Sequence, residues 1–207
     1  MRGSAGRVPE TGDGRKNDLM RAQERFFEGD VLSLSKAIRA LINLRPKANI
    51  YKFIAETLQR LLSGSLVFVS TYDEMSFTLY VRAAAGLGNN ADKVICLLGR
   101  HPVGVSVQMN DAARNGLGKG RLEIVSGGLH ELTTGALPLK VCASIESLIN
   151  ITGVYAMGLT WDGRIMGSVA ILMQGGSEIA SPTVVESFVN YAAVALRRRH
   201  EAIVDWV

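Results

Sequence analysis

The sequence predicts an α+β domain built around a mainly antiparallel sheet of about five to six strands, with helices packed on it. Two hairpin patterns give the first indication: Ser65–Tyr72 with Phe77–Ala84, and Val154–Thr160 with Ile165–Met173. Tight turns join antiparallel strands, whereas parallel strands need a long crossover. Strands and long helices do not alternate along the chain, so the order disfavours a doubly wound nucleotide-binding fold.

The Asp162-Gly163 pair is the clearest turn signal in the sequence. A type I′ turn needs φ > 0 at both central residues, and Asp-Gly is a preferred pair for that geometry. The strand after the turn carries apolar or small residues on both sides, which is typical of a strand with both faces covered. We therefore predict that this strand is internal to the sheet, with Val169 and Ile171 buried.

Helical patterns precede the first hairpin. One apolar face runs through Val31, Leu34, Ile38 and Leu41 and ends before Pro46. A second helix is predicted over about residues 50–62, because its apolar residues recur at i, i+3 and i+4.

Shorter patterns occupy the middle of the chain, and a long helix closes it. The predicted elements are a helical patch at 90–98, a strand at 105–109, a loop or helical turn at 110–120, a short strand at 122–125, a helix with Pro138 in its first turn, and a last helix from Pro182 to Trp206. The last helix is apolar on more than one side, which predicts contacts on two faces.

Composition narrows the function classes. The 207 residues suit one domain with flanking helices or two small domains, and the net charge of +4 gathers near the ends, as at Arg197–Arg199. Basic ends without a basic face disfavour nucleic-acid binding. Cys96 and Cys142 form no CxxC motif, which disfavours a disulfide framework or a zinc site. No apolar run approaches the roughly 20 residues that span a bilayer, so a cytoplasmic location is expected.

The ordered set of patterns resembles a GAF domain, a sensory relative of the PAS fold. The resemblance rests on the helix ending Leu61-Leu62-Ser63-Gly64, the hairpin that follows it, the closing hairpin with Asp162-Gly163-Arg164-Ile165-Met166-Gly167, and the last helix with Tyr191-Ala192-Ala193-Val194-Ala195-Leu196. These sequence segments are similar to GAF segments of archaeal, methanogen-type multi-sensor histidine kinases.

The resemblance implies a division of the chain. Residues 1–17 are rich in glycine and charge, so they are expected to be disordered or non-native. The resemblance implies that 18–33 is a connecting helix, 34–198 the sensory domain, and 199–207 the end of a signalling helix. A small ligand would bind in a pocket, and its state would pass through the terminal helices to adjoining signalling domains. The chain itself is not expected to be an enzyme, because its residues contain no kinase core and no defensible catalytic set.

Several ligand-assigned GAF branches are disfavoured. The sequence lacks the Asn-Lys-Phe-Asp-Glu string of cyclic-nucleotide phosphodiesterases, the Asp-Ile-Pro and Cys-His pair of bilin photoreceptors, and the cysteine trio of free-methionine sulfoxide reductases. The segment 115–120 also lacks the spacing of a phosphate-binding loop, and we interpret it as a flexible lid.

By the same resemblance, the pocket lies between the sheet and the middle segment. Its predicted residues are Val105, Val107, His130, Cys142, Tyr155 and Met157. One alternative is a haem-based redox or gas sensor, with Cys142 and His130 attaching or ligating the haem. The simpler interpretation is that Cys142 is a small buried hydrophobic residue and that His130 caps a helix or lies at the surface.

Assembly is the last expectation. We predict a homodimer through the terminal helices, using Val31, Leu34, Ile38, Phe188, Tyr191 and Val194. The alternative is that the N-terminal helices cover the last helix within one chain. A further alternative is a dimerisation module that binds no ligand.

Overall fold

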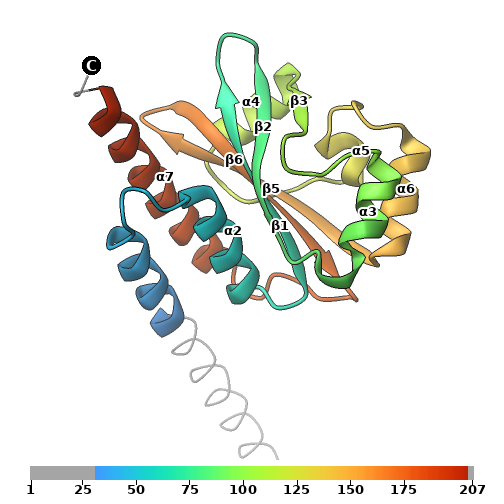
Figure 1. The fold of residues 1–207 in the computed structure, drawn as a ribbon, viewed down its shortest axis with the longest axis horizontal. Coiled ribbons are helices and arrows are strands. Elements are labelled where there is room, and N and C mark those ends of the chain that lie inside the picture. Colours follow the sequence, from blue (N-terminus) through green and yellow to red (C-terminus); the bar gives the residue numbers. More distant parts are fainter. Residues whose placement is uncertain (1–30, 205–207) are drawn as a thin grey trace, which may run out of the picture.

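The two predicted hairpins form the centre of a six-stranded antiparallel sheet ordered β3-β2-β1-β6-β5-β4. The computed structural model describes residues 31–204, with side chains described to residue 201. The expectations for 1–17, for most of 18–33 and for Trp206 therefore lie outside the described residues. Figure 1 shows helices on both faces of the sheet, which confirms the predicted α+β class.

The elements follow the predicted order closely. A helix at 31–42 precedes all labelled elements. The others are α2 (Ile50–Leu61), β1 (Ser65–Asp73), β2 (Thr78–Ala85), the 3-10 turn η1 (Gly88–Asn90), α3 (Ala91–Leu98), β3 (Ser106–Gln108), α4 (Asp111–Gly118), β4 (Glu123–Ile124), α5 (Gly128–Leu132), α6 (Leu139–Leu148), β5 (Ile151–Trp161), β6 (Arg164–Gln174) and α7 (Pro182–Val204). The segment predicted as a loop or helical turn is the helix α4, and the Asn110 side chain caps it by accepting the Ala113 N–H at 2.8 Å.

The prediction for the closing hairpin is confirmed. Strand β6 pairs antiparallel with β5 on one side and with β1 on the other. Asp162 and Gly163 have φ values of 48° and 71°, as a type I′ turn requires. Val169 and Ile171 are fully buried, because β6 is central in the sheet and α2 and α7 cover that face.

One face of the sheet packs against α2, α7 and the helix at 31–42, which lie together on one side in Figure 1. This core, which we call the helix-face core, takes its side chains from alternate strand positions and from the inner side of α7. Its fully buried members include Ile54, Leu58, Met157, Leu159, Val169, Ile171, Phe188 and Val189.

The residues predicted to form the dimer differ in how deeply they are buried. Phe188 is fully buried in the helix-face core, so its assignment to a partner surface is wrong. Leu34 and Ile38 are half-buried against the same core, so the helix at 31–42 packs on this core within one chain. Val194 is half-buried, whereas Val31 and Tyr191 are about half exposed.

Arg199 fastens α7 to the loop before α2. Its guanidinium donates to the carbonyl oxygens of Ala48 at 2.7 Å, Arg45 at 2.8 Å and Leu44 at 3.3 Å. Hydrogen bonds from a charged donor are stronger than neutral ones. The basic end of the last helix is therefore in part a structural clamp and not a fully solvated end.

Candidate functional site

The other face of the sheet carries small residues where its central strands meet. In the register of β1, β6 and β5, Ser70 lies beside Ser168 and Ser168 beside Gly158. The adjacent row places Ala170 between Phe68 and Ala156. Short side chains leave space above the sheet, because the covering helices cannot descend to fill it without leaving their other contacts.

A β-bulge in β2 adds two side chains to this face. The register shifts between Val69 and Ser70 of β1, so that Ala83 pairs on the helix face while Val81 pairs beside Ser70. A bulge places an extra residue on one strand and reverses which side chains face each side beyond it. Leu79 and Val81 consequently line the hollow.

The middle segment closes the hollow into a cavity of about 120 Å³. Its walls come from strands β1, β2, β3 and β6, from the segment before β3, from α3, α5 and α6, and from the segment between α5 and α6. They consist of Leu66, Phe68, Ser70, Leu79, Val81, Val94, Leu98, Pro102, Val105, Val107, Leu129, Leu132, Thr133, Leu137, Ile145, Ser168, Ala170 and Leu172. Among the residues that the structure describes, no charged side chain lines this cavity.

Two serines supply the polar groups on the sheet side of the cavity. Ser70 and Ser168 are each 6% exposed, and both line it. Within the described residues no hydrogen bond involves either hydroxyl, whereas the Thr133 hydroxyl donates to the Leu129 carbonyl oxygen at 2.9 Å. The serine hydroxyls are therefore available to a bound molecule as donors or acceptors.

A second cavity of about 190 Å³ adjoins the first. Both cavities are lined by Leu79, Val107, Leu132, Ser168 and Ala170. Helix α4 covers the second cavity and approaches β5 closely: a Cβ at Gly158 would fall on the Leu117 carbonyl oxygen, so only glycine fits there. The remaining wall is more polar and includes Asn110, Glu123, Glu131 and Thr134.

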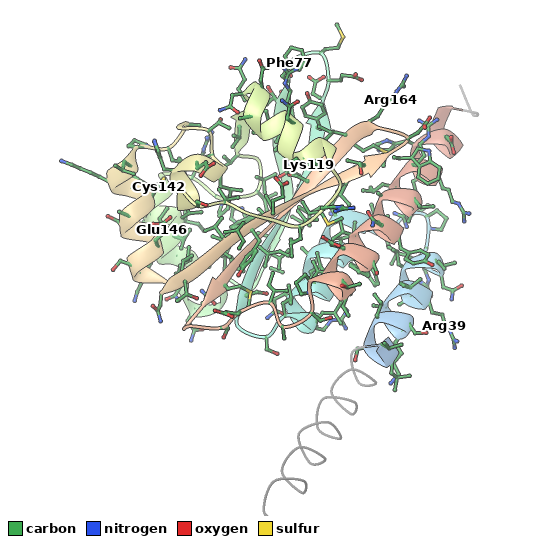
Figure 2. All side chains as sticks on the ribbon, turned by 180° about the vertical axis from the view of Figure 1, so that it is seen from behind. Arg39, Phe77, Lys119, Cys142, Glu146 and Arg164 are labelled. Carbon is green, nitrogen blue, oxygen red and sulfur yellow. The ribbon has the colours of Figure 1, made fainter. Side chains whose placement is uncertain are left out.

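The segment 119–124, which we call the strap, follows α4 in the chain and contacts α7. It leaves the end of α4 and ends in β4, the edge strand of the sheet, and Figure 2 shows Lys119 at its start. Glu123 lines the second cavity, while Leu122 packs against the helix-face core. The Leu122 N–H donates to the Glu186 carboxylate of α7 at 2.9 Å. One short segment thus contacts both the cavity and the last helix.

The structure divides the predicted pocket residues into three groups. Val105 and Val107 line the first cavity, and Val107 also lines the second. His130 and Cys142 belong to the covering helices, yet neither lines the first or the second cavity. His130 has its Nδ1 3.0 Å from the Leu137 carbonyl oxygen, and Cys142 packs among apolar side chains behind the wall.

Tyr155 and Met157 lie on the opposite face of the sheet, so their assignment to the pocket is wrong. They pair with Ile171 and Val169 and pack in the helix-face core. Successive residues of a strand point to opposite faces, and the cavity side of β5 is formed by the residues between them, such as Ala156. The prediction chose the wrong set of alternate residues, because both faces of β5 carry apolar side chains and the pattern does not distinguish them.

The arrangement does not fit the haem alternative at this site. Cys142 and His130 do not line the cavities, and burial raises the pKa of the Cys142 thiol, an effect that Glu146 adds to. A haem-ligating cysteine must be a thiolate, which such surroundings disfavour. Figure 2 shows Cys142 and Glu146 together on α6, away from Lys119. Within residues 31–201 no group of three metal-ligating side chains is present either.

The two thiols are expected to react very differently with a thiol reagent such as DTNB. Cys96 is exposed, whereas Cys142 is buried and its thiol has a raised pKa. At neutral pH the native protein should react rapidly at Cys96, and Cys142 should react only after denaturation. The Cys96→Ser variant should lose the fast phase. A fast phase that persists in that variant would place Cys142 at the surface instead.

Comparison with solved structures identifies the fold. The chain is similar to the chromophore-binding domain of an unusual bacteriophytochrome from R. palustris, with a TM-score of 0.60 and 12% identity over 86% of this chain and 63% of that chain. It is also similar to the GAF domain of an Acinetobacter phosphoenolpyruvate-protein phosphotransferase, with a TM-score of 0.56 and 12% identity over 83% of this chain and 94% of that one. The chain has a GAF fold.

The GAF fold agrees with a third similar structure, the chromophore-binding domain of a Stigmatella aurantiaca phytochrome, with a TM-score of 0.56 and 12% identity over 83% of this chain and 60% of that chain. The chain thus spans less than two thirds of the phytochrome chains that it matches. No protein-family model matches the sequence, and no curated protein matches it significantly. Within residues 31–204, no helix is both long and apolar enough to cross a bilayer.

Sequence reasoning missed the small residues that create the cavity and the acidic residue that joins the strap to α7. A signal for the former was present: small residues recur at alternate positions, as in Ala156 and Gly158 of β5 or Ser168 and Ala170 of β6. No comparable signal existed for Glu186, which lies 64 residues after Leu122.

Proposed function

We propose that this chain is a sensory or regulatory domain that binds a small molecule in the two adjoining cavities and relays its presence through the terminal helices. The observation that carries the proposal is the apolar cavity on the GAF sheet, with the buried hydroxyls of Ser70 and Ser168 on its sheet side. Ligand sites are typically apolar hollows with a few placed polar groups. An engineered apolar cavity of about 150 Å³ binds benzene. The first cavity, at about 120 Å³, is therefore close to the size that holds a small apolar group.

The contacts of the strap with the second cavity and with α7 support the proposed relay. A molecule that entered the second cavity would contact Glu123 and the α4 cover, and any displacement of the strap would act on the Leu122–Glu186 hydrogen bond. Helix α7 packs on β5 and is held at its other end by Arg199. A ligand shifts such an equilibrium only through unequal affinity for the two arrangements of the strap.

The wider context is also part of the proposal. The domain would act by binding, without a reaction of its own, on adjoining signalling domains. The resemblance to GAF segments of archaeal histidine kinases favours a kinase as the output. Exposed Val31 and Tyr191 on the terminal helices favour a homodimer, with a smaller apolar surface than the sequence suggested.

The proposal is tested with 1-hexanol as a probe of the cavity. Hexanol at about 100 times its dissociation constant should stabilise the native state by roughly 2.7 kcal/mol and raise the melting temperature accordingly. Hydrogen exchange should show altered protection at residues 111–125 and in α7. The absence of any stabilisation up to the solubility limit would contradict a small-molecule site.

Glu186→Ala is expected to separate binding from relay. It removes the acceptor of the Leu122 N–H, while hexanol still stabilises the protein because Glu186 does not line either cavity. The change in α7 exchange on adding hexanol should disappear, while the change at 111–125 remains. Glu186→Gln is the matched control, since its amide oxygen can still accept the same hydrogen bond. If α7 responds equally in Glu186→Ala, the strap does not carry the relay.

A further inference from the structure

The two cavities differ in chemistry although they share a wall. The first is lined by apolar side chains with Ser70, Thr133 and Ser168, and no charge from the described residues lines it. The second adds two carboxylates, Glu123 and Glu131, and among the described residues no lysine or arginine lines it. A molecule that fills both must therefore have an apolar part and a polar part.

We propose that the site takes an amphiphilic molecule whose apolar body occupies the first cavity and whose hydrogen-bond-donating head, an amine or a hydroxyl and not an anion, lies in the second. This proposal rests on the proposed function and names the class of its ligand. Ser168 is 6% exposed, lines both cavities and has no partner within the described residues, so it can bond the molecule at the junction.

The charges around the second cavity favour a donor head. Glu123 Oε1 accepts from Lys119 Nζ at 2.5 Å, but the lysine is more than half exposed and does not line the cavity. Glu131 Oε2 accepts the Gly127 N–H at 2.6 Å, which leaves its other oxygen free for a ligand. An anionic head would meet both carboxylates, and like charges at contact distance repel.

Two other cationic features nearby do not reverse this balance. The N-terminus of α4 faces the second cavity, but Asn110 already accepts the Ala113 N–H and Asp111 adds negative charge to the first turn. Arg114 pairs with Asp111 and lies over the Phe77 ring at 4.2 Å from its centroid. Neither feature places a cationic side chain in the wall of the cavity.

A matched series of three molecules tests the proposal: hexylamine, 1-hexanol and hexanoate share one tail and differ in the head. Dissociation constants are measured by NMR titration of the full chain at neutral pH and one ionic strength. Hexylamine should bind at least about tenfold more tightly than hexanoate, with hexanol between them. Hexanoate binding as tightly as hexylamine would overturn the ligand class while leaving a small-molecule site in place.

A double variant, Glu123→Gln with Glu131→Gln, tests the role of the carboxylates. Glutamine keeps the size of each side chain and can still accept the Gly127 N–H. The advantage of hexylamine over hexanol should disappear, because neither glutamine amide carries the negative charge that favours an ammonium head. An unchanged advantage would overturn the assignment of the head to the second cavity. Failure of all three molecules to bind the native chain would overturn the ligand class together with the proposed function.

Discussion

Replacing Phe188 with alanine is expected to lower the free energy of unfolding by about 3–5 kcal/mol, the cost typical of truncating a buried phenylalanine. Phe188 is 0% exposed and extends from α7 into the helix-face core, so its truncation would leave a void there. Because proteins of this size are stabilised by only about 5–15 kcal/mol, this loss removes a large part of the total. The melting temperature should fall on the order of 10 °C.

The matched control is Tyr191→Ala on the same helix. Tyr191 is 50% exposed, so its truncation should change the melting temperature little. The pair also separates folding from assembly. In a homodimer formed through the exposed side of α7, Tyr191→Glu should dissociate the dimer in sedimentation experiments without unfolding it, whereas Phe188→Glu should unfold the chain. A folded Phe188→Glu variant would contradict the burial of this side chain.

Filling the cavity is expected to abolish ligand binding without destabilising the fold. Ala170 lines both cavities and lies between Phe68 and Ala156 in the sheet register. Leucine at this position would occupy space that is otherwise empty, and cavity filling commonly adds roughly 0.5–2 kcal/mol of stability. The stabilisation by hexanol, and by any natural ligand of this site, should be lost.

Ala143→Leu provides the same change of side chain on an exposed position of α6. It should retain the full response to hexanol. Thermal melts of the native protein and both variants, with and without hexanol, decide the matter. If Ala170→Leu still responds fully, hexanol binds elsewhere; if it unfolds, the hollow is already filled by side chains in solution. Either result would argue against the cavity as the site.

Much of the fold follows from local patterns. Alternating apolar residues give each strand a period of two, and the Asp162-Gly163 pair requires a hairpin that brings β5 beside β6. The two-sided apolar character of β6 similarly places it inside the sheet. These features depend on residues a few positions apart, so the sequence contains all the information that they need.

The candidate site was only partly predictable. Val105 and Val107 line it as expected, because the predicted strand at 105–109 pairs beside β2 at the edge of the sheet, where Val107 lies beside Leu79. Tyr155 and Met157 were predicted on the wrong face of the sheet. Both faces of β5 are covered and apolar, so the sequence pattern does not show which residues face the cavity. Cys142 and His130 belong to the right helices, but their helical faces turn them away from the cavity.

The sequence by itself determined most of the strands and helices, which strands form hairpins, and that the strand after Asp162-Gly163 lies inside the sheet. Only the tertiary structure decided which face became the hollow one, that Phe188 fills the opposite core, and that Leu122 meets Glu186 across 64 residues. The physical reason is that helix and strand periodicity arises from neighbours along the chain. The side on which side chains pack, and where they leave space, depends on the sizes of residues that meet only after folding.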